Sequence, residues 1–223
     1  MQLRHSLKIR PGITAVIGSG GKTALLYALG KELRREGRVL LCTTTRIWPP
    51  QEIPWTDYSR PDAIQSALVS EGLLCLGMPR PDGKLGPPVL PMDALASLAD
   101  FILVEADGAA GRPLKAHLSH EPVIPQQQNQ VIAVVGLLGL GLPIAQAAHR
   151  AARFAALSGA HIQDPATPER VAQVLRTEAL HTRVFLNQAE QPERAPLGAS
   201  LAALLGCPAV LGSLQKGWST CLC

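Results

Sequence analysis

The run "GSGGKT", from Gly18 to Thr23, combines glycines with one lysine and one hydroxyl side chain. Glycines let backbone N–H groups turn toward a phosphate, and a lysine at this spacing reaches the β- and γ-phosphates. The hydroxyl of Thr23 is suited to hold Mg²⁺. A helix that follows directly would aim the positive end of its dipole at the same anion. The run therefore predicts a loop that binds the phosphates of a nucleotide.

The longer motif G-x-x-x-x-G-K-[S/T] would begin at residue 16, where Val16 stands in place of the first glycine. The alternative is a glycine-rich turn that only starts a helix and leaves Lys22 in solvent. The strand–loop–helix context and the G-K-T ending favour nucleotide binding over this alternative. The residues expected to contact the nucleotide here are Gly18, Ser19, Gly20, Gly21, Lys22, Thr23 and Ala24.

Two carboxylates, Glu105 and Asp107, follow the apolar run "FILV". Residues two apart share one face of a strand, and parallel sheets bind ligands beyond the carboxyl ends of their strands. We therefore expect Lys22, Glu105 and Asp107 to be catalytic. Thr23 and Asp107 would hold Mg²⁺, and Glu105 would orient water or substrate. The alternative is a pair of ordinary surface acids.

Further polar residues follow predicted strands. Hydroxyls and a guanidinium in "TTTR" could contact Mg²⁺, phosphate or a substrate anion, although β-branched residues that simply finish a strand fit equally well. The basic residues of "GRPLKAHLSHE" suit a substrate pocket or a solvated loop. The substrate or phosphate candidates are Thr43, Thr44, Thr45, Arg46, Arg112 and Lys115.

Asn187 follows another strand, at a place where GTPases carry N-K-x-D to bind guanine. Gln188 and Glu190 replace the lysine and the aspartate, so guanine specificity is not predicted. Asn187 is still included among the nucleotide contacts. ATP is the favoured nucleotide, and GTP stays open.

These residues need a scaffold of buried strands and amphipathic helices. Apolar β-branched runs predict strands, and helical spacing of leucines predicts a helix from Lys22 to Gly37. Alternating strands and helices predict an α/β fold, a mainly parallel sheet with helices on both faces, like P-loop NTPases. We expect one domain over residues 1–223, with a proline-rich loop or lid at about 49–61. The other strands are expected at 12–18, 38–45, 72–78, 101–108, 131–137, 183–188 and 208–213.

Composition narrows the class of protein. The chain has 47% hydrophobic and 17% charged residues, which is typical of a compact globular protein. The net charge is only +4. The sequence has no run of Lys and Arg residues that would indicate nucleic-acid binding. The N-terminus lacks a secretory signal, which favours the cytoplasm. Residues 126–148 are uncharged, but their glycines and proline argue against a membrane span.

The five cysteines lack the paired spacing of a zinc site. Cys221 and Cys223 are expected on a mobile tail, where two thiols could bind a soft atom such as selenium or sulfur. Tail cysteines without a function are the simpler expectation.

Several longer segments resemble the YqeC family: "GSGGKTALL", "LLCTTTRIWPP", "ILVEADGAAGRPLKAH", "HEPVIP", "HRAARFAALSG" and "FLNQAE". The family is regarded as a selenium cofactor biosynthesis protein, an accessory factor of selenium-dependent molybdenum hydroxylases. The resemblance implies a P-loop nucleotide-binding domain. It also implies partners among the molybdenum cofactor, a selenium donor and an apo-hydroxylase.

The short loop is similar in kind to that of the Mur ligases, G-T-x-G-K-T, and Val16 would then belong to the strand. The leading interpretation is a Mg²⁺-dependent NTPase or phosphoryl-transfer enzyme. The alternatives are a nucleotide-gated chaperone with little turnover, and a kinase or ligase that acts on a small substrate.

Overall fold

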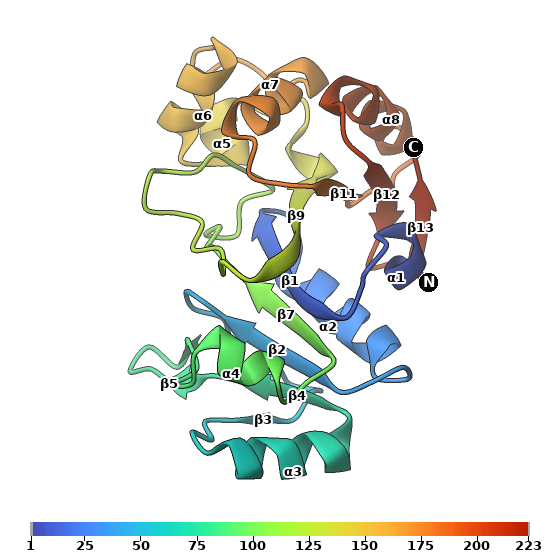
Figure 1. Ribbon diagram of the computed structural model, residues 1–223. Helices are drawn as coiled ribbons and strands as arrows, with labels where there is room; N and C mark the ends of the chain where they lie inside the picture. The colour runs from blue at the N-terminus through green and yellow to red at the C-terminus, as the bar shows by residue number, and fades with distance from the viewer. Residues whose placement is uncertain (1, 223) are drawn as a thin grey trace.

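A computed structural model describes residues 2–222, so Cys223 lies outside the described residues. A nine-stranded sheet runs through it in the order β13-β12-β11-β9-β1-β7-β2-β4-β3 (Figure 1). Its strands are β1 (Gly12–Gly18), β2 (Val39–Thr43), β3 (Trp55–Thr56), β4 (Leu73–Leu76), β7 (Phe101–Glu105), β9 (Gln128–Gly136), β11 (Arg183–Asn187), β12 (Ala209–Ser213) and β13 (Trp218–Cys221). Neighbouring strands are parallel, except that β13 is antiparallel to β12. The predicted α/β class with a mainly parallel sheet is confirmed.

Helices cover both faces of the sheet. They are α1 (Leu3–Ser6), α2 (Lys22–Leu33), α3 (Pro61–Glu71), α4 (Met92–Ala96), α5 (Ile144–Ala147), α6 (Ala151–Ser158), α7 (Pro168–Glu178) and α8 (Arg194–Leu205), with a 3₁₀ turn at Leu137–Gly139. Helices α1 and α2 pack on one face. The opposite face carries α3 and α4 at one end and α5 to α8 at the other (Figure 1).

The core follows from alternation along the strands. Ile13, Ala15 and Ile17 of β1 face the side of α3 to α8, and Val16 faces the side of α2. Val16 is fully buried and pairs in register with Glu105 of β7. The valine that breaks the longer loop motif is therefore a core residue of a central strand.

Two short strand pairs lie outside the main sheet. Strands β5 (Met78–Pro79) and β6 (Leu85–Gly86) form an antiparallel hairpin. Strands β8 (Leu114–Lys115) and β10 (Ala148–His149) pair in parallel. These additions matter because each brings basic side chains toward the carboxyl ends of the central strands.

Several predicted boundaries are wrong. Helix α2 ends at Leu33, and Gly37 lies in the turn beyond it. The proline-rich segment 49–61 is not all loop, because it contains β3 and ends where Pro61 begins α3. The expected mobile tail is instead the edge strand β13, in which Cys221 pairs with Val210. Helices α1, α5 and α6 were not predicted from the sequence.

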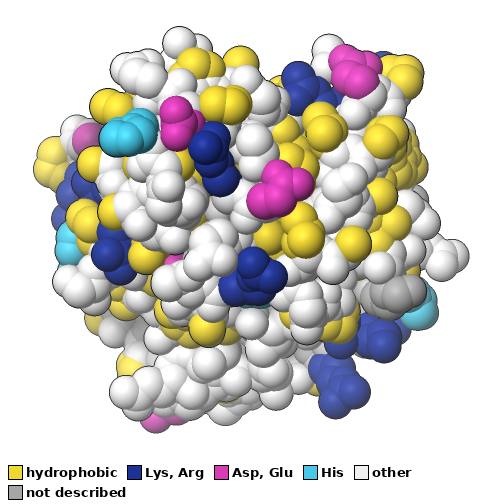
Figure 2. Space-filling view, turned by 90° about the horizontal axis from the view of Figure 1, so that it is seen from above, with side chains coloured by type: hydrophobic (Ala, Val, Ile, Leu, Met, Phe, Trp, Pro, Cys, Tyr) yellow, Lys and Arg dark blue, Asp and Glu magenta, His cyan; other side chains and the backbone are white. Residues whose placement is uncertain are grey.

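The uncharged segment 126–148 forms β9, the 3₁₀ turn, α5 and the first residue of β10. Within residues 2–222, no helix has the length and apolar character needed to cross a membrane. On the face seen in Figure 2, acidic and basic side chains are interspersed among hydrophobic ones.

Candidate functional site

The predicted phosphate loop joins β1 to α2 at the carboxyl edge of the sheet. Gly18, Gly20 and Gly21 all adopt positive φ angles, of 89°, 88° and 123°, which glycine tolerates best. The backbone N–H of Ser19 donates to Val134 O at 2.9 Å, and its hydroxyl donates to Arg112 O. Helix α2 then begins at Lys22, so its free N–H groups face the loop.

Gly20 lies against the backbone of a neighbouring strand. A Cβ at Gly20 would stand 2.4 Å from both Cα and N of Gly136, and 3.0 Å from Pro113 O. All three atoms belong to the backbone, so no side chain can move aside. The loop is held against the end of β9 by a contact that only glycine permits.

Gly20→Ala is expected to destabilise the protein by about 1–3 kcal/mol more than Gly206→Ala, because it adds overpacking to a similar backbone penalty. Gly206 has a similar φ of 70°, yet no described heavy atom beyond its chain neighbours lies within 4 Å of its added Cβ. Urea unfolding of both variants measures the difference. Equal stabilities would contradict the close contact.

Lys22 is the cation of the loop. It is only 5% exposed, and its Nζ donates to Gly18 O at 2.8 Å. The same Nζ lies 3.2 Å from Asp107 Oδ1 and 3.8 Å from Glu105 Oε1. The structure thus brings together the three residues predicted to be catalytic.

Glu105 ends β7, next to β1, and accepts a hydrogen bond from the Thr23 hydroxyl at 2.7 Å. Burial raises the pKa of Glu105, and the charge of Lys22 and the hydrogen bond from Thr23 only partly offset it. A hydroxyl and a carboxylate oxygen at the start of α2 are the hard ligands that Mg²⁺ prefers. Both side chains line the cleft described below.

Asp107 lies below the loop and is fully buried. Its Oδ2 accepts from Gly18 N at 3.0 Å and lies 2.7 Å from His117 Nε2 and 3.2 Å from Lys115 Nζ. Among the described atoms, Oδ1 accepts no hydrogen bond and faces Lys22 in an ion pair. Burial favours the neutral acid, but the hydrogen bond with His117 and the charges of Lys22 and Lys115 lower the pKa of Asp107 to about 2.

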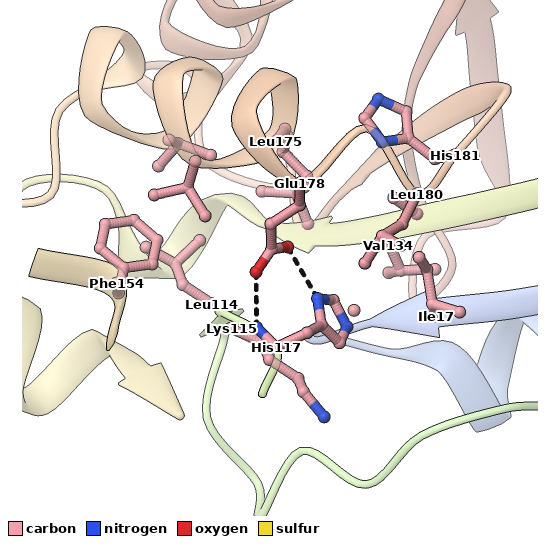
Figure 3. A pocket seen from close by; sticks show the side chains of 15 residues that line it. Ile17, Leu114, Lys115, His117, Val134, Phe154, Leu175, Glu178, Leu180 and His181 are labelled. Atoms are coloured by element: carbon pink, nitrogen blue, oxygen red, sulfur yellow. Dashed lines mark hydrogen bonds and ion pairs between the residues drawn. The ribbon is translucent and has the colours of Figure 1, made fainter. Parts of the chain in front are cut away.

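His117 connects Asp107 to helix α7. Its Nδ1 lies 2.7 Å from Glu178 Oε2, and its backbone N–H donates to Glu178 Oε1 at 2.6 Å. Figure 3 shows Glu178 extending from α7 to both nitrogen atoms. Burial lowers the pKa of His117, but the hydrogen bonds to Asp107 and Glu178 outweigh this and raise it. Glu178 is a site residue that the sequence interpretation missed.

Lys115, predicted to contact substrate or phosphate, is buried beside Asp107 instead. Its Nζ lies 2.7 Å from Glu121 Oε2 and also donates to Gly108 O. Arg150 contacts the other oxygen of Glu121 at 3.1 Å. The structure therefore places Lys115 in an internal network of charges and not on the wall of the cleft.

The residues that end and follow β2 have two roles. The threonines make hydrogen bonds within the protein, and Arg46 lines the cleft. Thr43 donates to Glu105 O at 2.8 Å, and Thr44 donates to Val123 O at 2.7 Å. The backbone N–H of Thr45 donates to the hydroxyl of Thr43. Arg46 lines the cleft and pairs with Asp82 at 3.2 Å. Arg112 also lines the cleft, and it donates to Gln146 O.

Asn187 braces the loop from β11. Its Nδ2 donates to Gly20 O at 2.8 Å, and its Oδ1 accepts from Leu214 N at 3.2 Å. Its amide is thus engaged on both sides within the protein. The neighbouring Gln188 lines the cleft.

A cleft of about 690 Å³ opens over the loop, within the usual size range of ligand sites. Within residues 2–222, four cationic side chains line it, against the single carboxylate of Glu105. The lining includes Gly20, Gly21, Lys22, Thr23, Ala24, Arg46, Trp48, Lys84, Glu105, Arg112 and Gln188. Chemically, the cleft can hold an anion at a helix N-terminus, neutralise it with Lys22, and offer two oxygen ligands to a divalent metal.

A family model described as "YqeC protein" matches residues 14–152. The chain is 38% identical over 158 residues to "Uncharacterized protein YqeC" of Escherichia coli strain K12, covering 67% of this chain and 62% of that protein. The matched part thus spans less than two thirds of the relative's length.

Among solved structures, the chain has a limited similarity to the crystal structure of the Signal Recognition Particle 54 kDa protein from Aeropyrum pernix K1 in complex with GDP. The TM-score is 0.43 at 15% identity, and the match covers 96% of this chain and 44% of that chain. Glu178 and Asn187 lie outside the segment that the family model matches. By the extent of the family match and the 38% identity, the chain belongs to the YqeC family.

Proposed function

We propose that this protein binds a nucleoside triphosphate together with Mg²⁺ and acts on its γ-phosphate, with ATP favoured over GTP. The observation that carries the proposal is the arrangement around the start of α2. Three glycines with positive φ precede Lys22 and Thr23, and the hydroxyl of Thr23 contacts Glu105 on the adjacent strand. Phosphate-binding loops use these same groups.

Magnesium is assigned to Thr23 and Glu105 in this proposal. The sequence interpretation gave it to Thr23 and Asp107. Asp107, however, already contacts three donors through Oδ2 and Lys22 through Oδ1, and none of its surface is exposed. Glu105 lies at the cleft and touches Thr23 directly. Bound Mg²⁺ would neutralise charge on the β- and γ-phosphate oxygens.

Each protein group then has a distinct task. The backbone N–H groups at the start of α2 bind phosphate oxygens, and Lys22 exchanges its contacts with Asp107 and Glu105 for the γ-phosphate. Asp107 positions the loop through Gly18 N. Arg46 and Arg112 are available at the cleft for substrate or phosphate oxygens.

In the cell, we place this activity in selenium cofactor biosynthesis, as an accessory to selenium-dependent molybdenum hydroxylases. Membership of the YqeC family supports this role. The proposed partners are the molybdenum cofactor, a selenium donor or an apo-hydroxylase.

A nucleotide-gated switch is the second candidate. The contacts that favour it run from Lys22 through Asp107 and His117 to Glu178 on α7. Movement of Lys22 to a phosphate would change the charge balance at Asp107 and so reach a distant helix. Turnover by the isolated protein would support the enzyme, and turnover only with a partner would support the switch.

A thermal shift screen tests nucleotide binding itself. ATP with Mg²⁺ is expected to raise Tm, because a ligand at about 100 times its Kd adds roughly 2.7 kcal/mol to the free energy of unfolding. The same concentration of GTP reports base preference, and EDTA reports the contribution of the metal. A Tm that is unchanged by ATP, GTP and ADP would contradict the proposal.

A further inference from the structure

Trp48 is held at the edge of the cleft by hydrogen bonds to its own backbone and to that of its neighbour Ile47. Ile47 forms a bridge with Leu85 of β6, through Ile47 N to Leu85 O at 3.0 Å and Leu85 N to Ile47 O at 2.8 Å. The hydroxyl of Tyr27 on α2 donates to Trp48 O at 3.4 Å. Trp48 is thereby placed beside Lys84, in the turn of the β5–β6 hairpin.

Trp48 is 62% exposed, although it lines a cleft. Lys84 Nζ lies 5.1 Å from the ring centroid, within the range of a cation–π contact. The Cβ that Gly83 lacks would lie 3.5 Å from Trp48 Cζ3, so the hairpin turn also packs against the ring. One large aromatic surface is thus fixed in position and left accessible.

Trp48 lies on the side of the phosphate loop that carries Thr23. Together with Thr23 it lines both the large cleft and an adjoining pocket of about 330 Å³. Thr23 contacts Glu105 of β7, whereas Gly21 lies against Asn187 of β11, on the other side of β1 in the sheet. In the proposed function, Lys22 contacts the β- and γ-phosphates and Thr23 holds Mg²⁺. Under the proposed function, Trp48 therefore lines the side of the cleft where Thr23 would meet the metal and the γ-phosphate.

The charges around the ring favour an anion. Arg46 and Lys84 line the same cleft as Trp48, and Arg112 lines it too. Arg46 pairs with Asp82, but more than half of its side chain is exposed and available to a ligand. An exposed aromatic ring beside two cations suits a flat ring that carries a negative group.

We propose that Trp48, Lys84 and Arg46 form a second subsite that takes a planar aromatic substrate with an anionic group. The inference rests on the proposed function, since it places this substrate opposite the γ-phosphate of a bound nucleotide. The ring lies on Trp48, and the anionic group contacts Lys84 and Arg46. The cleft would then hold the nucleotide on one side and, on the other, the substrate that accepts the phosphoryl group.

Flavin mononucleotide is a suitable probe, because it joins a fluorescent planar ring to a phosphate, and riboflavin carries the same ring without the phosphate. Each is titrated into the full chain saturated with ADP and Mg²⁺, with quenching of flavin fluorescence as the readout. Flavin mononucleotide is expected to bind at least about tenfold more tightly than riboflavin.

Trp48→Ala is expected to weaken binding of flavin mononucleotide by about tenfold or more, as for other lost stacking contacts. Its Kd for ADP should stay within about twofold, a difference well below 1 kcal/mol. Lys84→Ala should weaken the binding of flavin mononucleotide but not the binding of riboflavin. Trp55→Ala is the matched control, because Trp55 is an exposed tryptophan on β3. It should change neither ligand's affinity.

Three results would overturn the subsite: no binding of flavin mononucleotide up to about 1 mM, equal binding by Trp48→Ala, or competition between flavin mononucleotide and ADP. If Trp48→Ala instead loses ADP affinity, the ring belongs to the nucleotide site. Failure of the wild-type chain to bind ADP, ATP and GTP would contradict the proposed function. In that case, titration of the nucleotide-free protein still tests whether Trp48 and Lys84 bind the flavin.

Discussion

Lys22→Ala is expected to lower kcat by about 10²–10³-fold, the usual result when one donor to a developing oxyanion is removed. The affinity for ATP with Mg²⁺ should fall at least about tenfold, since a hydrogen bond to a charged group is lost. The reason lies in the position of Nζ, which is buried at the helix N-terminus between Glu105 and Asp107. Calorimetric titration and a phosphate-release assay measure the two effects.

Lys8→Ala provides the control for the loss of a positive charge, because Lys8 is exposed and precedes β1. It should bind and turn over nucleotide like the wild type. Circular dichroism and Tm of Lys22→Ala separate a site effect from unfolding. A folded Lys22→Ala protein with unchanged ATP affinity and turnover would contradict the assignment of the phosphate loop.

Asp107→Ala is expected to destabilise the protein by about 3–5 kcal/mol, because it leaves buried cations without their counter-charge. Lys115 and Lys22 both lie 3.2 Å from the carboxylate, and the side chains of Asp107 and Lys115 are fully buried. For a chain of this length, Tm should fall on the order of 10 °C. The exposed Asp57 supplies the control substitution, Asp57→Ala.

The same carboxylate makes the free energy of unfolding depend on pH, and the protein loses stability as the pH falls. The pKa of Asp107 falls from an ordinary 3.8 to about 2 on folding, so its ionised form stabilises the fold. This contribution, on the order of 2 kcal/mol, is fully present above pH 4 and is lost as the pH falls toward 2. Asp107→Asn should lack it. Parallel stability curves for both proteins between pH 5 and 2 would contradict this account of Asp107.

Much of the scaffold follows from local patterns. Apolar runs predict the central strands, and "GSGGKT" predicts the turn into α2 because glycine and G-K-T placement are local properties. The approach of Glu105 to Thr23 also follows, since the carboxyl ends of parallel strands meet at one edge. Helix α7 begins at Pro168, a residue favoured at the first helical position, with Thr167 as N-cap accepting a hydrogen bond from Arg170 N.

The second layer of the site could not be predicted in this way. His117 and Glu178 are 61 residues apart, and nothing local marks Glu178 as more than a helix residue. The roles of Glu105 and Asp107 also depend on depth: one carboxylate reaches the cleft and the other is covered by Lys115 and His117. Strand β7 ends at Glu105 and not at residue 108 as predicted, so Asp107 lies past the strand, where strand spacing indicates neither its depth nor what packs over it.

The burial of Lys115 has the same origin. A lysine in a polar loop is usually solvated, and only the fold brings Glu121 and Asp107 within 3.2 Å of its Nζ. Trp48 and Lys84 likewise come from separate connections, and the bridge between Ile47 and Leu85 joins them. Such contacts between loops leave no periodic pattern in the sequence, so the sequence does not predict them.

The support that α7 and β11 give to the loop has a practical consequence for anyone who dissects the chain. Residues 14–152 match the family model and contain the loop, Glu105 and Asp107. A fragment ending at residue 152 would leave β9 as a bare sheet edge and would remove the carboxylate that holds His117 and the amide that holds Gly20. We therefore expect residues 14–152 not to form a working site when expressed alone. The site needs the residues of α7 and β11 as well.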